Sequence, residues 1–178
     1  ADIDALSGHA KEFQDTLANE IIPMIDRRFR TVPGARMIVG HSYGGLFATY
    51  TMLSRPGLFS DYVIVSPSYW YDNRLIFRLA NSFIADHHAL SAHVFYAVGS
   101  FEGGGQMARD LRAFDGVFRA ANLSGYECTL EVFDGETHNS VVPGALSRGL
   151  RVRYRFSGEA AAAAVDAATP SRHNQDER

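Results

Sequence analysis

Segments in which apolar residues recur at helical spacing alternate along this chain with short runs that are continuously apolar. Near the N-terminus, Leu6, Ala10, Phe13 and Leu17 recur at helical spacing. Pro23 should break or restart that helix. Further along, short continuous apolar runs predict buried strands, and each is followed by a run with helical periodicity. The predicted strands are 36–39, 62–65, 93–98 and 126–133, and the helices that follow them are 44–54, 73–86, 107–121 and 141–154.

Short apolar strands that alternate with helices are typical of an α/β fold, in which a parallel sheet carries helices on both faces. The carboxyl ends of the strands then lie at one edge of the sheet, where ligand sites of open α/β sheets form. We expect residues 1–157 to be part of a single domain. Residues 158–178 are rich in alanine and then polar, which predicts a frayed helix with a disordered end.

Composition and charge narrow the function classes. The chain has 178 residues, of which 46% are hydrophobic and 21% charged, and its net charge is −3. This composition suits one globular domain and provides no basic excess that would favour nucleic acid or an anionic membrane. No apolar run reaches membrane-spanning length. Since Cys128 is the single cysteine, we expect a buried structural thiol, no intrachain disulfide and no cysteine-rich metal site, and both a cytoplasmic and a periplasmic location stay open.

The run Gly40-His41-Ser42-Tyr43-Gly44 stands between a predicted strand and a predicted helix. It matches the G-x-S-x-G pattern of a nucleophile elbow, a tight turn that lifts a serine hydroxyl above the sheet. Both glycines are expected because a side chain at either position would collide with the neighbouring strand or helix. The alternative is a glycine-rich turn in which the serine only caps the helix. Ser42 is therefore the candidate nucleophile.

A serine nucleophile needs a base, and the base needs an orienting carboxylate. With this elbow the expected chain order is Ser, then Asp or Glu, then His. His138 follows the fourth predicted strand, at the same sheet edge as Ser42, and is the candidate base. Glu102 follows the third strand in a glycine-rich loop that can bend toward His138, and is the candidate acid. Asp110 and Glu136 are the rival acids.

Further residues are candidates for binding. The backbone N–H of Tyr43 should donate to the oxyanion of the reaction, aided by the dipole of the helix that follows. Tyr69 and Trp70 follow the second strand, and they line either a substrate pocket or a packing cluster over the sheet edge. His41 is a candidate substrate contact, and its side chain is expected to point away from the partner of the serine.

With these residues placed, the chain resembles the esterase D family of α/β hydrolases, and within it the enterobactin-type siderophore esterases. The runs that carry the resemblance are 40–47, 66–70, 98–103 and 137–138. The resemblance implies an α/β-hydrolase fold and a serine esterase that cleaves a small-molecule carboxylic ester through an acyl-enzyme, with no cofactor and no metal. By position it assigns the nucleophile to Ser42, the base to His138 and the acid to Glu102.

The resemblance also implies several strands ahead of the first predicted helix, together with a second oxyanion donor. Strand 36–39 would otherwise lie at an open sheet edge and expose apolar side chains and unpaired backbone groups. We therefore expect an N-terminally truncated piece. If it were the whole protein, we would expect poor solubility or a homodimer formed by strand pairing, and little catalysis. Two alternatives stay open: an inactive hydrolase-like module for interaction or dimerisation, and an acyltransferase with the same triad, because an alcohol and water attack the same acyl-enzyme.

Overall fold

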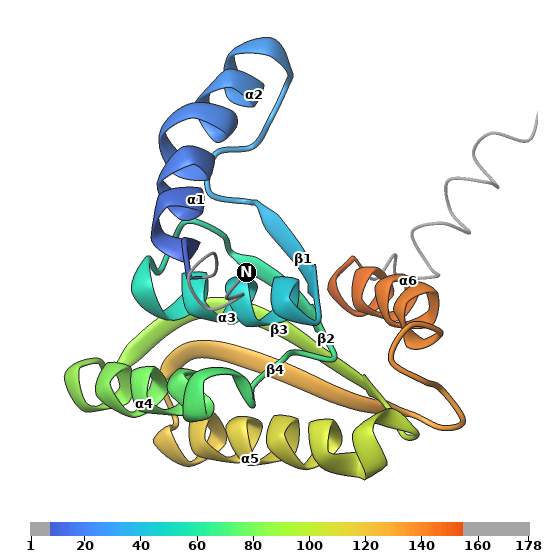
Figure 1. Cartoon of the computed structure of the whole chain (residues 1–178). Helices are drawn as coiled ribbons and strands as arrows, with labels where there is room; N and C mark the ends of the chain where they lie inside the picture. The colour runs from blue at the N-terminus through green and yellow to red at the C-terminus, as the bar shows by residue number, and fades with distance from the viewer. Residues whose placement is uncertain (1–7, 155–178) are drawn as a thin grey trace, which may run out of the picture.

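The protein is described by a computed structural model over residues 8–154. Within those residues, four strands form one parallel sheet in the order β1-β2-β3-β4 (Figure 1). The strands are β1 (Met37–His41), β2 (Asp61–Val65), β3 (Ala89–Gly99) and β4 (Ser124–Phe133). Each strand lies one position further across the sheet than the strand before it. Because all four run in the same direction, their carboxyl ends meet at one edge.

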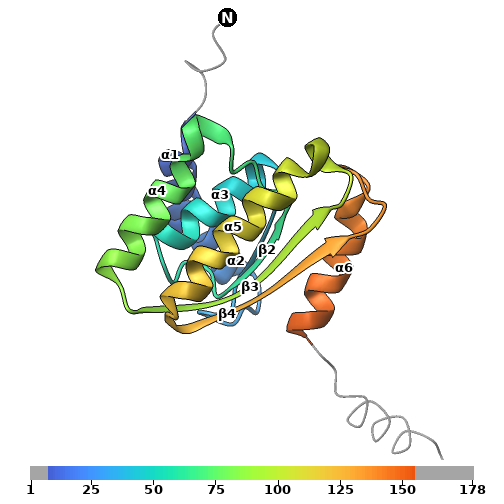
Figure 2. The ribbon, with the colours of Figure 1, turned by 90° about the horizontal axis from the view of Figure 1, so that it is seen from below.

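Helices cover both faces of this sheet, as predicted (Figure 2). Three helices that connect successive strands pack on one face and build the larger apolar core: α3 (Tyr43–Ser54), α4 (Tyr71–Asp86) and α5 (Gln106–Ala121). On the other face, α6 (Val141–Arg153) buries Val141 and Ala145 against Val63 and Phe95. The fold class is therefore α/β, with the sheet between two helical layers.

Helix α5 shows why these segments adopt their structure. Leu111, Phe114 and Phe118 recur on one face of the helix, and all three are fully buried in the core. Gly105 precedes the helix with a φ of 83°, and Asn122 follows it with a φ of 47°. Both are residue types that adopt the left-handed conformation readily, so α5 begins and ends where the local sequence allows the chain to turn.

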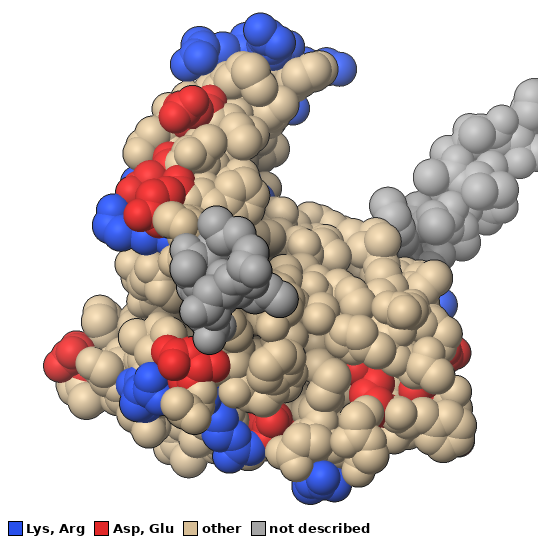
Figure 3. All heavy atoms as spheres, in the orientation of Figure 1, with Lys and Arg blue, Asp and Glu red and all other residues tan. Residues whose placement is uncertain are grey.

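The N-terminal segment forms one continuous helical arm, so of the two outcomes predicted for Pro23 the helix restarts there and does not break. It consists of α1 (Ala10–Thr16), a π-helical segment η2 (Leu17–Ile21) and α2 (Ile22–Arg28). The backbone N–H of Ile22 bonds to the carbonyl of Leu17, five residues earlier. This wider turn accommodates Pro23, which cannot donate a backbone hydrogen bond, at the start of α2. Figure 3 shows Lys and Arg side chains gathered at the far end of the arm, where α2 ends.

Strand β1 is an outer strand of the sheet that the structure describes, in agreement with the predicted open edge. It pairs with β2, and Val39 at its middle is 49% exposed. Large apolar side chains are also exposed along the arm, at Phe13, Ile25 and Phe29. This side of the molecule therefore presents apolar surface beside an open strand edge.

The ends of the chain fall outside this description. The predicted tail, residues 158–178, lies outside the described residues, as does Leu6 of the first predicted helix. Over residues 8–154, no helix combines the length and apolar character needed to span a membrane.

Candidate active site

Ser42 lies in a sharp turn between β1 and α3, with the unusual backbone angles φ 57° and ψ −117°. A Cβ on Gly40 would lie 2.1 Å from the carbonyl oxygen of Gly44, so glycine is required at position 40. The expectation of a second collision at Gly44 is wrong, because a Cβ there meets nothing within 4 Å. The second close approach is at Gly45, where a Cβ would lie 3.1 Å from the Cα of Pro67. The turn is thus strained and tightly packed, as a nucleophile elbow is.

The hydroxyl of Ser42 lies 3.2 Å from the hydroxyl of Ser68, which follows β2. The backbone N–H of Ser68 also donates to the carbonyl of Ser42, at 3.1 Å. Tyr43 occupies the first position of α3, where backbone N–H groups have no intrahelical acceptor. The structure therefore places free donor capacity and the positive end of a helix dipole directly after the Ser42 hydroxyl.

Glu102 and His138 lie together, although they come from loops after different strands. The Nδ1 atom of His138 is 2.8 Å from Oε2 of Glu102. The other carboxylate oxygen, Oε1, accepts hydrogen bonds from the Ser66 hydroxyl and the Gly99 backbone N–H, both at 2.6 Å. Glu102 is only 2% exposed. Both of its oxygens are therefore engaged, and the carboxylate has a fixed orientation toward the imidazole.

Glycines make this arrangement geometrically accessible. Gly103, Gly104 and Gly105 all have positive φ values, between 50° and 83°, and they turn the chain from η3 (Glu102–Gly105) into α5. A Cβ on Gly99 would lie 2.3 Å from the carbonyl oxygen of Glu136, so the loop that carries His138 approaches β3 closely only because position 99 is glycine. The glycine-rich loop that carries Glu102 was predicted to bend toward His138, and it does so through a specific tight turn.

The two rival acids are engaged elsewhere. Asp110 lies on α5, where its carboxylate pairs with the guanidinium of Arg74 and accepts a hydrogen bond from Gln106 at 2.8 Å. Glu136 accepts a hydrogen bond from the hydroxyl of Ser140. Of the three candidates, Glu102 is the one that contacts the His138 imidazole.

The expectation that the His41 side chain points away from the partner of the serine is wrong. Its Nε2 atom lies 2.8 Å from the backbone oxygen of His138, and the two imidazole rings lie 4.4 Å apart between centroids. Within the described residues, Ser42 and His138 themselves share no hydrogen bond. Catalytic hydrogen bonds are often long in unliganded sites and tighten when substrate binds.

The two neighbouring aromatic candidates have opposite environments. Tyr69 is fully buried, its hydroxyl lies 2.7 Å from that of Thr49, and its ring contacts Phe114 with centroids 4.6 Å apart. Burial raises the pKa of the Tyr69 phenol well above its ordinary value. Tyr69 therefore belongs to the core and is not available to a substrate. Trp70 is 51% exposed and lies edge-on to Tyr43, with ring centroids 5.8 Å apart, so it keeps its candidate role.

Two serines of the site escaped the sequence reasoning. Ser66 and Ser68 hold Glu102 and Ser42 respectively, and both are buried. Like Ser42, Ser66 has a positive φ, at 45°. Their position is a usable signal, because the run 66–68 follows the second strand at the sheet edge shared with Ser42.

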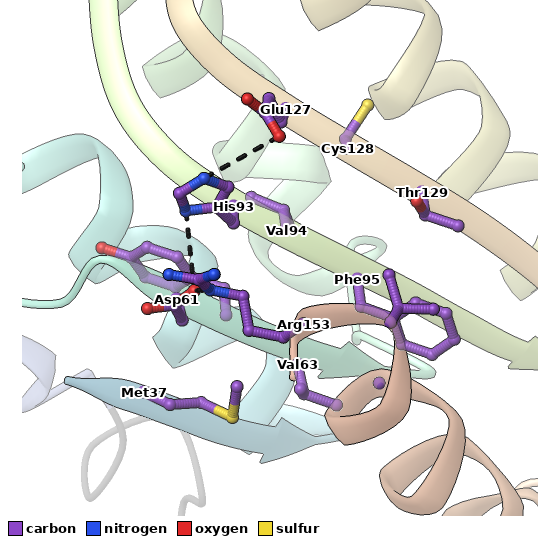
Figure 4. Close-up of a pocket in the computed structure, with 13 residues that line it drawn as sticks. Met37, Asp61, Val63, His93, Val94, Phe95, Glu127, Cys128, Thr129 and Arg153 are labelled. Carbon is purple, nitrogen blue, oxygen red and sulfur yellow. Dashed lines mark hydrogen bonds and ion pairs between the residues drawn. The ribbon is translucent and has the colours of Figure 1, made fainter. Parts of the chain in front are cut away.

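Cavities lie on both sides of the molecule. One, of about 450 Å³, is mostly apolar and lies beside the nucleophile turn, between α1, α3 and α4, with Tyr43, Leu46 and Leu75 in its wall. The other, of about 270 Å³, is lined by Asp61, His93 and further residues that Figure 4 shows. Asp61 begins β2, so this second cavity lies at the amino ends of the strands, at the edge opposite Ser42. It is therefore separate from the candidate active site.

Known proteins that are similar to this chain include esterases. The family model described as "Putative esterase" matches residues 5–103. The siderophore triacetylfusarinine C esterase of Aspergillus fumigatus is 30% identical over 171 residues, which cover 83% of this chain and 59% of that protein. The siderophore enterobactin esterase of Emericella nidulans is 32% identical, over 80% of this chain and 55% of that protein. The chain spans about half the length of these curated relatives.

Solved structures show the same likeness. The BES protein from Bacillus cereus superposes with a TM-score of 0.76 at 30% identity, over 82% of this chain and 56% of that chain. An IroE-like serine hydrolase from Shewanella oneidensis superposes with a TM-score of 0.74 at 26% identity, over 82% of this chain and 48% of that chain. These neighbours confirm the predicted α/β-hydrolase fold for the part of the chain that the structure describes.

Proposed function

Since the chain belongs to the esterase family, we propose that it hydrolyses a carboxylic ester of a small molecule through an acyl-enzyme formed on Ser42. One observation carries the proposal. The buried carboxylate of Glu102 holds the His138 imidazole at 2.8 Å, at the sheet edge where the strained turn presents Ser42. A base oriented by a carboxylate, at the same sheet edge as a half-buried serine, is the arrangement that nucleophilic acyl transfer requires.

In the proposed mechanism, Oγ of Ser42 attacks the ester carbonyl while Nε2 of His138 takes the hydroxyl proton. The carbonyl oxygen becomes an oxyanion, which accepts a hydrogen bond from the Tyr43 backbone N–H and is stabilised by the positive end of α3. The bond to the alcohol then breaks, and His138 returns the proton to the leaving oxygen. Water, deprotonated by His138, attacks the acyl-enzyme. The bond from the acyl carbon to Oγ then breaks, His138 returns the proton to Oγ of Ser42, and the acid leaves.

Glu102 has two tasks in this mechanism. Because a carboxylate only accepts hydrogen bonds, it keeps the hydrogen of His138 on Nδ1 and leaves Nε2 free to take a proton. Its negative charge also stabilises the imidazolium that forms during each step. The donors Ser66 and Gly99 occupy Oε1, so Oε2 remains directed at His138.

We propose a siderophore-type ester as the substrate class. Two curated relatives are named as siderophore esterases, one for triacetylfusarinine C and one for enterobactin. The exposed rings of Trp70 and Tyr43, beside Ser42, provide aromatic surface on which a flat ring of such a substrate can pack.

We also propose that residues 1–157 form part of one domain. For this chain taken by itself, without preceding strands, we propose that two copies pair through β1. The open edge of β1 and the exposed side chain of Val39 support the pairing, because unpaired backbone groups on an apolar edge template another strand. Light scattering at micromolar concentration should give twice the chain mass, and replacing Val39 by lysine should reduce it to one. A monomer in the wild type contradicts the pairing.

The test of the catalytic proposal is labelling by a fluorophosphonate probe, which reacts with activated serines. Wild-type protein should be labelled at Ser42, and labelling should be lost in Ser42→Ala. Wild-type protein should also release a burst of p-nitrophenol from p-nitrophenyl acetate, followed by turnover. Labelling that persists in Ser42→Ala removes the nucleophile assignment, and a folded wild type that shows neither labelling nor a burst contradicts the proposed function.

A further inference from the structure

His41 makes two contacts with His138 that the proposed acid–base steps do not use. Its Nε2 atom lies 2.8 Å from the backbone oxygen of His138. The two rings lie 4.4 Å apart between centroids, with 42° between their planes. His41 ends β1 and His138 follows β4, and these are the two outer strands of the sheet over the described residues. The contact therefore joins two loops that the sheet itself does not connect.

The contact from His41 complements the contact from Glu102. Glu102 binds the ring of His138 at Nδ1 and so orients the side chain. A carbonyl oxygen only accepts a hydrogen bond, so Nε2 of His41 carries the hydrogen and holds the main chain of His138. Two partners thus hold one residue, one at its ring and one at its backbone. Since His41 directly precedes Ser42, it ties that backbone to the nucleophile turn.

We propose that His41 is a positioning residue that holds the His138 loop at the distance from the nucleophile turn that proton transfer requires. The inference rests on the proposed function, because the position of His138 matters for catalysis only if His138 is the base for Ser42. In the structure the Ser42 hydroxyl bonds to Ser68, so it must turn toward His138 before the proton can be transferred. A tethered loop keeps His138 in one position for this transfer, whereas an untethered loop would reach the reactive geometry rarely.

Two replacements separate the hydrogen bond from the bulk of the side chain. In His41→Gln, the amide nitrogen reaches about as far as Nε2 and can donate to the His138 oxygen. In His41→Leu, the volume is similar but no donor remains. His88→Leu is the matched control, because His88 precedes β3 at the opposite edge of the sheet. Should His41→Leu fail to fold, His41→Asn replaces it, since the shorter amide does not reach the carbonyl.

Two readouts are needed, one for catalysis and one for the loop. The first is the rate of Ser42 labelling by the fluorophosphonate, with kcat and KM for p-nitrophenyl acetate. We expect His41→Leu to label about 100-fold more slowly, with kcat reduced and KM unchanged, because the contact places the base and not the substrate. The second is hydrogen–deuterium exchange of the segment 134–140, which should rise in His41→Leu. His41→Gln and His88→Leu should match the wild type in both.

The outcomes separate this inference from the proposed function. If wild-type Ser42 is labelled and His41→Leu is labelled equally fast, the positioning role is overturned while the catalytic proposal stands. If His41→Gln and His41→Leu lose the same amount, the hydrogen bond is not responsible and the inference is also overturned. If wild-type Ser42 is not labelled, the proposed function fails. Separately, if hydrogen–deuterium exchange of the segment 134–140 is unchanged in His41→Leu, the role of His41 in holding the loop is overturned, whatever the labelling shows.

Discussion

Replacing Glu102 by glutamine changes one charge at the centre of the proposed site while preserving the shape of the side chain. The Gly99 backbone N–H is a fixed donor 2.6 Å from Oε1, so the amide oxygen of the glutamine must face it. The amide NH2 group then faces Nδ1 of His138, which lies 2.8 Å from Oε2 in the wild type. Nδ1 must accept that hydrogen bond, and the imidazole hydrogen moves to Nε2. In that tautomer His138 does not take the proton of Ser42.

The expected loss is about 10⁴-fold in kcat, the effect of the corresponding Asp-to-Asn change in a serine triad of another fold. At about 1.36 kcal/mol per factor of ten, this corresponds to about 5.5 kcal/mol of transition-state stabilisation. Since Glu102 is 2% exposed, water does not substitute for the missing charge. KM should change little, because the carboxylate contacts His138 and not the bound ester.

The assay is stopped-flow release of p-nitrophenol, which measures acylation of Ser42 separately from turnover. Glu136→Gln is the matched control, because Glu136 is two residues from His138 but accepts its hydrogen bond from Ser140. Circular dichroism shows whether each variant is folded. If folded Glu102→Gln acylates within about tenfold of the wild type, or if Glu136→Gln loses as much, the reasoning about the His138 tautomer is refuted.

Three further predictions follow from individual contacts. Ser66→Ala removes one of the two donors to Glu102 Oε1, so kcat should fall about tenfold with KM unchanged, and a wild-type kcat would contradict the role of Ser66. Gly40→Ala forces a Cβ against the carbonyl of Gly44 and should lower the free energy of unfolding in urea by about 3 kcal/mol, whereas Gly44→Ala, which meets open space, should not cause a loss of that size. Burial, followed by the hydrogen bond to Asp115, raises the pKa of the Cys128 thiol to about 11, so its reaction with Ellman's reagent at pH 8 should be slow until the protein unfolds. Because this folded pKa lies above the unfolded value near 9, the thiol's contribution to stability should be present below pH 9 and decline as the pH rises toward 11.

Local features of the fold were predictable because they depend on neighbours in sequence. The order of strands and helices follows from short-range periodicity, and the structure reproduces it across the described residues. The element boundaries were less accurate. Strand β3 begins at Ala89, four residues before the predicted start at 93, because Ala89 and Ala92 pair with Ser124 and Tyr126 of β4. That pairing depends on a partner more than thirty positions away, which periodicity does not report.

The candidate residues Ser42, Glu102 and His138 were predictable from topology. In a parallel sheet, residues directly after strands share one edge, which places all three residues there. The G-x-S-x-G pattern and the expected chain order then favoured them, although Glu136 at the same edge stayed a rival acid. The helix at Pro23 shows where such rules stop short. A proline in a helical pattern predicts a break or a restart, and only the structure shows that the chain widens into a π-helical turn and restarts as α2.

The α/β architecture, the turn at Ser42 and the loops of the proposed acid and base could be read from the sequence alone, because each depends on spacing over a few residues or on strand order. Three features needed the folded structure: Glu102 accepts hydrogen bonds from Ser66 and Gly99, Tyr69 is buried while Trp70 is exposed, and His41 contacts the backbone of His138. Such contacts depend on side-chain directions across separate loops, and the distances between those loops are set by how the helices pack on the sheet.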